Sequence, residues 1–174
     1  MTQSDSKIRE RQAEARQAVI TDVAAHEAGH AVAYWCYGEI VLTLNVSSDD
    51  GGFCQPRFPS GQTTVESVRQ SMVMTAAGPA AAALLCGTPA EPSGKDADDL
   101  QRMARTLHGM LADEATIKAE IDEALQRAQA LVQRHAKAIH RVAVRIVETT
   151  NEIATTRTTL WEKEIDLEDE IKTS

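Results

Sequence analysis

The chain has 174 residues and a formal net charge of −8, a length that suits one domain with a core of ordinary size. The excess of acidic side chains excludes a general nucleic-acid-binding protein, because such proteins present a basic face. Hydrophobic residues make up 43% of the chain but aromatic residues only 3%, so the core must be built mainly from aliphatic side chains. This composition favours a mainly α-helical fold.

The N-terminal segment is polar and charged, and it contains no apolar run of signal-peptide length. The longest apolar stretch, residues 76–86, is interrupted by Gly78 and Pro79 and is shorter than the ~20 residues that a membrane-spanning helix needs. We therefore expect a soluble, cytoplasmic protein with no membrane span. Residues 1–17 are expected to form a charged helix or arm, and residues 18–174 a single domain.

Apolar residues recur at helical spacing from Ala18 onward, and Gly38 follows as a stop signal. Residues 39–48 alternate apolar and polar side chains and predict a strand. The glycine-rich segment 49–52 predicts a turn, after which residues 53–55 return as a short second strand. A β-hairpin or short sheet is thus expected beside the first helix.

The rest of the sequence predicts helices. Thr63 with Glu66 has the spacing of a capping box at the start of the second helix. Pro79 is expected to kink that helix or to open the next one, which ends at Gly87. Further helices are expected over residues 96–111, over residues 114–150 as one or two segments, and over residues 161–172.

His26-Glu27-Ala28-Gly29-His30 is an H-E-x-x-H motif inside the first predicted helix. Residues four apart lie on one face, so both imidazoles can bind the same Zn²⁺. Glu27 lies about 100° around the helix, where it can act as general base for a water whose pKa the metal lowers toward about 7. The alternative is that His26 and His30 are core histidines and Glu27 is solvated.

A catalytic zinc site needs a third protein ligand and an open position for water. Carboxylates are most concentrated at the start of a predicted helix, where Asp96, Asp98 and Asp99 lie within four residues. Acidic residues there also stabilise a helix N-terminus without any metal. Spacing alone does not choose among the three.

Four blocks of the sequence resemble, in order, the peptidase domain of FtsH, an ATP-dependent zinc protease. Residues 26–32 match its zinc helix, typically HEAGHA, and residues 77–87 resemble its G-R-A-A-E-E-L-x-x-G helix. Ser93-Gly94 followed by Asp99-Leu100 is similar to its S-x-G-A-x-x-D-L segment, and residues 162–171 are similar to its C-terminal E-K-E-T-L…E-I tail. The resemblance extends over most of the chain.

This resemblance implies that Asp99 is the third zinc ligand, because Met110 aligns with a methionine downstream of the family's zinc-binding aspartate. Asp96 and Asp98 remain alternatives. The resemblance also allows a homo-oligomer or a separate unfoldase partner. The chain has no G-x-x-x-x-G-K-[ST] loop for ATP, so we expect ATP-independent action on peptides or unfolded proteins.

The expected function is that of a zinc-dependent endopeptidase that cleaves unfolded or flexible polypeptides. Gly51, Gly52 and Phe53 are candidate substrate-binding residues, since an extended peptide can add to a strand edge beside the zinc and glycines permit close approach. An ordinary hairpin turn explains the same glycines. The alternative function is a non-catalytic, zinc-binding helical adaptor or regulatory module derived from such a peptidase.

Overall fold

The computed structural model describes residues 21–47, 51–57, 63–153 and 157–161. The motif helix (residues 21–36 of this part) comes first. It is followed by the strands β1 (Ile40–Ser47) and β2 (Gly51–Arg57) and the helices α2 (Val65–Cys86), α3 (Gly94–His108), α4 (Glu114–Arg134) and α5 (Ala136–Ile153). A final strand, β3 (Arg157–Trp161), returns to the sheet. The mainly helical fold with a small sheet is confirmed.

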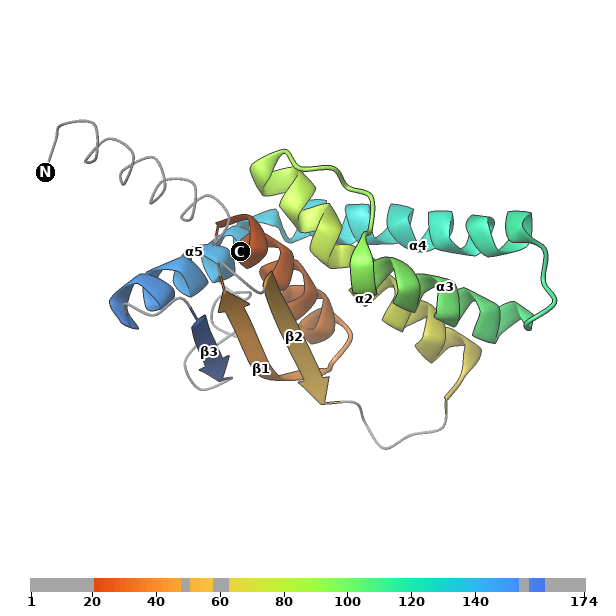
Figure 1. Ribbon diagram of the computed structural model, residues 1–174, viewed down its shortest axis with the longest axis horizontal. Helices are drawn as coiled ribbons and strands as arrows, with labels where there is room; N and C mark the ends of the chain where they lie inside the picture. The colour runs from red at the N-terminus through yellow and green to blue at the C-terminus, as the bar shows by residue number, and fades with distance from the viewer. Residues whose placement is uncertain (1–20, 48–50, 58–62, 154–156, 162–174) are drawn as a thin grey trace, which may run out of the picture.

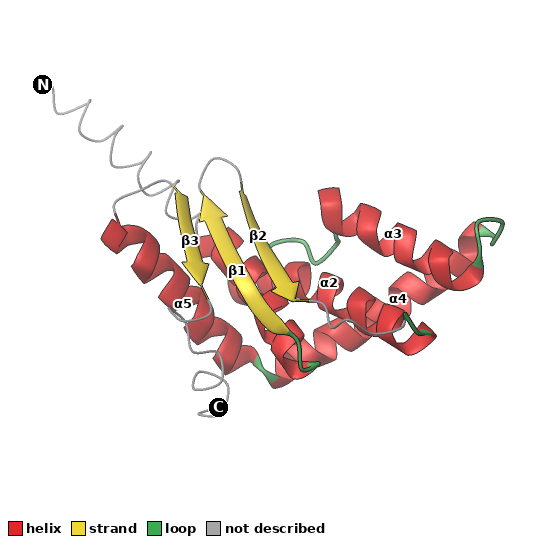
Figure 2. Ribbon diagram, turned by 90° about the horizontal axis from the view of Figure 1, so that it is seen from below, coloured by secondary structure: helices red, strands yellow, loops and turns green. Residues whose placement is uncertain are grey.

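The sheet has the strand order β2-β1-β3, and both pairings of β1 are antiparallel. Its strands lie at one end of the molecule beside α5, and α3 and α4 extend the structure toward the other end (Figure 1). The motif helix lies against one face of the sheet (Figure 2). This packing buries Leu44 and Val46 of β1, as the predicted alternation requires. An irregularity between Val41 and Thr43 shifts the pattern at the start of the strand, where Val41 is buried and Ile40 is 41% exposed.

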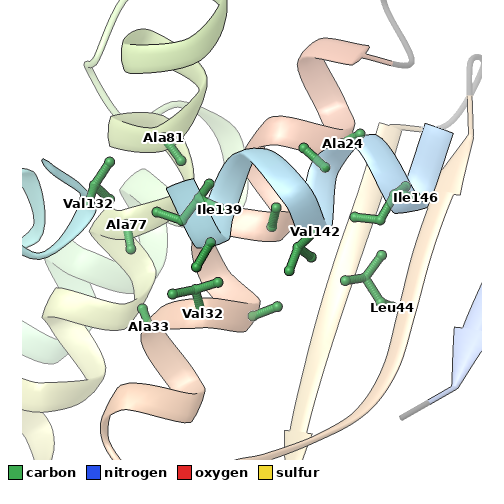
Figure 3. Close-up of a cluster of buried hydrophobic side chains, with 14 of the residues drawn as sticks. Ala24, Val32, Ala33, Leu44, Ala77, Ala81, Val132, Ile139, Val142 and Ile146 are labelled. Carbon is green, nitrogen blue, oxygen red and sulfur yellow. The ribbon is translucent and has the colours of Figure 1, made fainter. Parts of the chain in front are cut away.

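The core joins the motif helix to its neighbours on three sides. Its members come from the motif helix, β1, α2, α4 and α5, as Figure 3 shows. Small side chains dominate the motif helix, where Ala24, Ala28, Ala31 and Ala33 are fully buried. The alanines let neighbouring elements approach the helix closely, which explains how a core with few aromatic residues is filled.

Gly29 of the motif has a packing role against α2. A Cβ added there would lie 2.5 Å from the carbonyl oxygen of Ala77 and 2.5 Å from the Cβ of Ala81. Neither group can move without moving the α2 backbone. The absence of a side chain at Gly29 therefore sets the short distance between the two helices that build the site.

Several predicted boundaries are wrong in detail. The N-cap of α2 is Thr64, whose hydroxyl accepts from the backbone N–H of Ser67 at 3.0 Å, and not Thr63. Pro79 lies inside α2, which continues to Cys86 and ends at Gly87 in the left-handed conformation. The helix expected over 96–111 starts at Gly94 and ends at His108, before a Gly109 with positive φ.

The sheet is also larger than expected. Gly51 and Gly52 do not form the turn but pair with Ser47 and Val46 as part of β2. Trp161 ends β3 instead of opening a helix. The segment 114–150 divides into α4 and α5 at His135. The expected N-terminal arm and the C-terminal acidic segment lie outside the described residues.

Candidate metal centre

His26 and His30 project from one face of the motif helix, as their spacing predicts. Their Nε2 atoms are 3.0 Å apart, and their rings meet edge to face with centroids 4.7 Å apart. His30 is buried and His26 is half-buried. The pair therefore presents two nitrogen atoms to one point at the edge of the core.

The orientation of His30 is fixed by α2. Its Nδ1 lies 2.9 Å from the carbonyl oxygen of Met74 in a buried hydrogen bond. A carbonyl only accepts, so Nδ1 carries the proton and Nε2 is the free nitrogen of the neutral ring. This arrangement is typical of metal-binding histidines, in which the second nitrogen donates to an outer partner that holds the ring in place.

Asp96 is the carboxylate that the fold brings to this point. Its Oδ2 lies 3.0 Å from His26 Nε2 and 3.5 Å from His30 Nε2. Burial opposes the charge of Asp96, but hydrogen bonds from the two imidazoles, when these carry a proton on Nε2, outweigh burial and hold the pKa of this carboxyl well below its usual range. Asp96 lies in the first turn of α3, where the helix dipole also favours a negative charge.

The three groups have the chemistry of a metal site. One ligand atom from each of His26, His30 and Asp96 lies within 4.8 Å of the others. Burial alone would lower the pKa of His30, yet Asp96 and Glu27 raise it, so a positive charge is favoured among these atoms. Two imidazole nitrogens and a carboxylate form a donor set that zinc accepts.

Gly78 of α2 leaves the space that these ligands need. A Cβ added at Gly78 would lie 2.6 Å from His30 Cε1 and 2.8 Å from His26 Nε2. Any side chain at this position would therefore displace both imidazoles. Gly78 was expected only to interrupt an apolar stretch and was not among the predicted site residues. Its signal is a glycine in the middle of a helical segment, which often marks a close approach.

Glu27 lies beside the histidines and is only 3% exposed. Its Oε2 is buried and has no hydrogen-bond partner. Burial raises the pKa of Glu27, although the nearby histidines oppose this shift. A buried carboxylate with a free oxygen beside a metal site has the position of a general base.

Asp99, the ligand that the FtsH resemblance implies, lies elsewhere on α3. Its Oδ2 is 2.8 Å from Lys95 Nζ and its Oδ1 is 2.6 Å from Arg102. Asp96 and Asp99 are one turn apart on α3, but only Asp96 has an oxygen within reach of both histidines, while both oxygens of Asp99 are bound to cations of its own helix. Asp98 is exposed. The geometry thus favours Asp96, an alternative that the spacing left open.

A cavity of about 590 Å³ opens beside the metal centre. His26 and Glu27 form part of its wall, and Gly52 of β2 forms another part. A Cβ at Gly52 would lie 2.8 Å from Glu27 Oε1, so this glycine allows β2 to approach the acid closely. The other two predicted substrate-binding residues, Gly51 and Phe53, are the neighbours of Gly52 in β2.

In the part of the chain that the structure describes, no helix has the length and hydrophobicity required to span a bilayer. Residues 11–90 match the family model described as Peptidase M50B-like. The match includes the H-E-x-x-H motif, the site glycines Gly29, Gly52 and Gly78 and all of α2, but it ends before Asp96 and covers just under half of the chain. A search of curated proteins found no match. The family match supports a peptidase-family domain, and M50-type peptidases are zinc metalloproteases.

Proposed function

We propose that this protein is a zinc-dependent endopeptidase in which His26, His30 and Asp96 hold the metal and Glu27 is the general base. The observation that carries the proposal is the convergence of these three ligand atoms within 4.8 Å next to a buried, unpartnered carboxylate oxygen of Glu27. The peptidase-family match is consistent with this chemistry. Relative to the sequence-based expectation, Asp96 replaces Asp99.

A bound Zn²⁺ supplies Lewis-acid chemistry, since it lowers the pKa of water and polarises a carbonyl group. The chain supplies the proton transfers. Glu27 takes a proton from the attacking water at its free Oε2, and it returns the proton to the amine that leaves when the peptide bond breaks.

The substrate is proposed to bind in extended form along β2. This strand is at the edge of the sheet in the described residues, and its Gly52 borders both the cavity and Glu27. A peptide that adds to such an edge is held by its backbone with little sequence preference. Because the chain must be extended to bind in this way, unfolded or flexible polypeptides are the expected substrates.

The relation to FtsH-type peptidases is part of the proposal. It is supported by the HEAGH sequence of the motif helix and by the second helix that packs on it through Gly29 and Gly78. The altered position of the acidic ligand on α3 is a departure from that family's pattern. Oligomeric assembly and an unfoldase partner remain expectations from the resemblance.

Metal analysis and peptide hydrolysis test the proposal. Protein purified without chelator is expected to contain about one zinc per chain and to cleave a reduced, unfolded protein. Glu27→Gln should keep the zinc and lower the rate by at least about 100-fold, since general acid–base catalysis contributes about 10²–10⁴-fold. Glu148→Gln, which removes an exposed charge on α5, is the matched control and should keep full activity.

Two outcomes would contradict the proposal. Stoichiometric zinc without cleavage of any unfolded protein or peptide would favour the non-catalytic adaptor instead. Full activity of a Glu27→Gln preparation free of wild-type protein would show that another group is the base.

A further inference from the structure

The cavity beside the metal centre contains more polar groups than the proposed reaction uses. Within the described residues, the buried side-chain oxygens without a hydrogen-bond partner are Asp22 Oδ1, Glu27 Oε2 and Thr88 Oγ1. All three residues line this one cavity. A buried oxygen that lacks a partner costs about 1–3 kcal/mol, so their concentration at one place indicates that a ligand supplies the missing donors.

The charge of the cavity indicates which kind of hydrogen-bond donor the ligand carries. Its described wall includes the carboxylates of Asp22, Glu27 and Glu91 and no lysine or arginine. The side chain of Lys95, which lies nearby on α3, is instead bound to Asp99 at 2.8 Å. A cationic group that enters the cavity would therefore meet negative charge on several sides and no described competing cation.

Most of the remaining wall is apolar. Val23, Pro79 and Ala82 contribute apolar surface, and Pro89 and Pro92 lie in the connection between α2 and α3. Prolines restrict the backbone of this connection, and the cavity has a volume of about 590 Å³. A long side chain with an aliphatic stem and a charged end matches this combination of surfaces.

We propose that the cavity is a specificity pocket for a basic side chain, lysine or arginine, of the polypeptide next to the scissile bond, with Asp22 as the main recognition group. This inference rests on the proposed function, since it names the preferred substrate of the same site. The ammonium or guanidinium group pairs with Asp22 Oδ1 and donates to Thr88 Oγ1. An apolar side chain fills the same space but leaves both oxygens unpaired.

Asp22 is suited to this role by its position. It lies one helical turn before His26 in the motif helix, so it faces the same side of the helix as the metal ligands. Its carboxylate also accepts a hydrogen bond from the Cys86 thiol at the end of α2. Glu27 serves the reaction and Glu91 is exposed, so Asp22, with its buried and unpartnered Oδ1, is the acid best placed for recognition.

The test is a cleavage-site profile on a peptide library digested by zinc-loaded protein and read by mass spectrometry. Wild-type protein is expected to show lysine and arginine enriched at one fixed position beside the cleaved bonds. Asp22→Asn should lower kcat/KM for a lysine peptide by about 10–100-fold and change that for its glutamine counterpart by less than about threefold. Asp22→Glu should retain the preference for the basic peptide.

Asp122→Asn is the control, because it removes the same charge from an ion pair with Lys118 on α4 and should leave the profile unchanged. Equal cleavage of lysine and glutamine peptides by wild-type protein would contradict the proposed preference for a basic side chain, but it would not contradict the proposed peptidase function. If wild-type protein cleaved no peptide, the proposed peptidase function would be wrong. Binding of the same labelled peptides, measured by fluorescence anisotropy, would then test whether the cavity recognises a basic side chain. Weaker binding of the lysine peptide to Asp22→Asn would support such recognition, and equal binding would overturn it.

Discussion

The choice between Asp96 and Asp99 gives the most discriminating prediction. Asp96→Asn removes a carboxylate whose Oδ2 is 3.0 Å from His26 Nε2 and whose side chain is 17% exposed. Asp99→Asn removes the same charge three residues away, from a carboxylate bound to Lys95 and Arg102. The two variants have the same length, charge and location on one helix, so each is the control for the other.

The magnitude follows from what each carboxylate contacts. Loss of an outer partner of a metal ligand already costs about 10–100-fold in metal affinity, so loss of a direct ligand should cost at least about 100-fold, or about 2.7 kcal/mol. Asp99 makes ion pairs with Lys95 and Arg102, whose side chains are 87% and 71% exposed. Such pairs are worth about 0–1 kcal/mol each, so Asp99→Asn should change zinc affinity by less than about threefold.

The assay is a zinc titration of the metal-free proteins in competition with a chromogenic chelator at pH 7.5. Circular dichroism of each variant confirms that α3 is folded. A 100-fold loss of affinity in Asp99→Asn with no loss in Asp96→Asn would refute the assignment. It would show that the first turn of α3 is oriented differently in the zinc-bound protein.

Three further predictions concern packing and charge. Gly78→Ala should weaken zinc binding by at least about 10-fold with little loss of stability, because the new Cβ lies 2.6 Å from His30 Cε1 while alanine favours the helix by about 1 kcal/mol. Gly29→Ala should lower the free energy of unfolding by about 1–3 kcal/mol through overpacking against α2. Glu120→Gln should lower it by about 1–3 kcal/mol at pH 7, because Glu120 is 8% exposed and binds Arg69 at 2.7 Å.

The same variants can be checked by zinc titration and urea unfolding. The hydrogen bond from Arg69 holds the pKa of Glu120 below its ordinary value of 4.5. This stabilisation is complete above pH 4.5, is lost as the pH falls through the lower folded-state pKa, and should be absent from Glu120→Gln. An unchanged pH dependence in Glu120→Gln would contradict the role of the Arg69 contact. Normal zinc affinity in Gly78→Ala would contradict the close approach to His30, and a more stable Gly29→Ala would contradict the close packing on α2.

The part of the candidate site that lies on the motif helix could be predicted, because its residues are close together in the sequence. His26, Glu27 and His30 lie in one helix, and helix geometry alone decides that four-residue spacing places both imidazoles on one face. The first strand was also predictable, since its alternation reports a one-sided burial. The break between α4 and α5 was less certain in the sequence, because His135 is neither a glycine nor a proline.

The position of the third candidate ligand on α3 depended on tertiary packing. Asp96 and Asp99 are chemically identical and close in sequence, and only the angle at which α3 meets the motif helix brings one of them to the histidines. The third strand was missed because residues 157–161 become a strand only by pairing with β1. Local propensity carries no information about such a partner.

The sequence by itself therefore predicted a mainly helical, acidic domain with two histidines and a glutamate at the spacing of a metal-binding motif. The tertiary structure decided which aspartate completes the set and which glycine makes room for it. It also decided that Asp22 and Thr88 border the same cavity as Glu27. The physical reason is that the motif is specified by the period of one helix, whereas the third ligand and the pocket depend on distances between elements that are far apart in the chain.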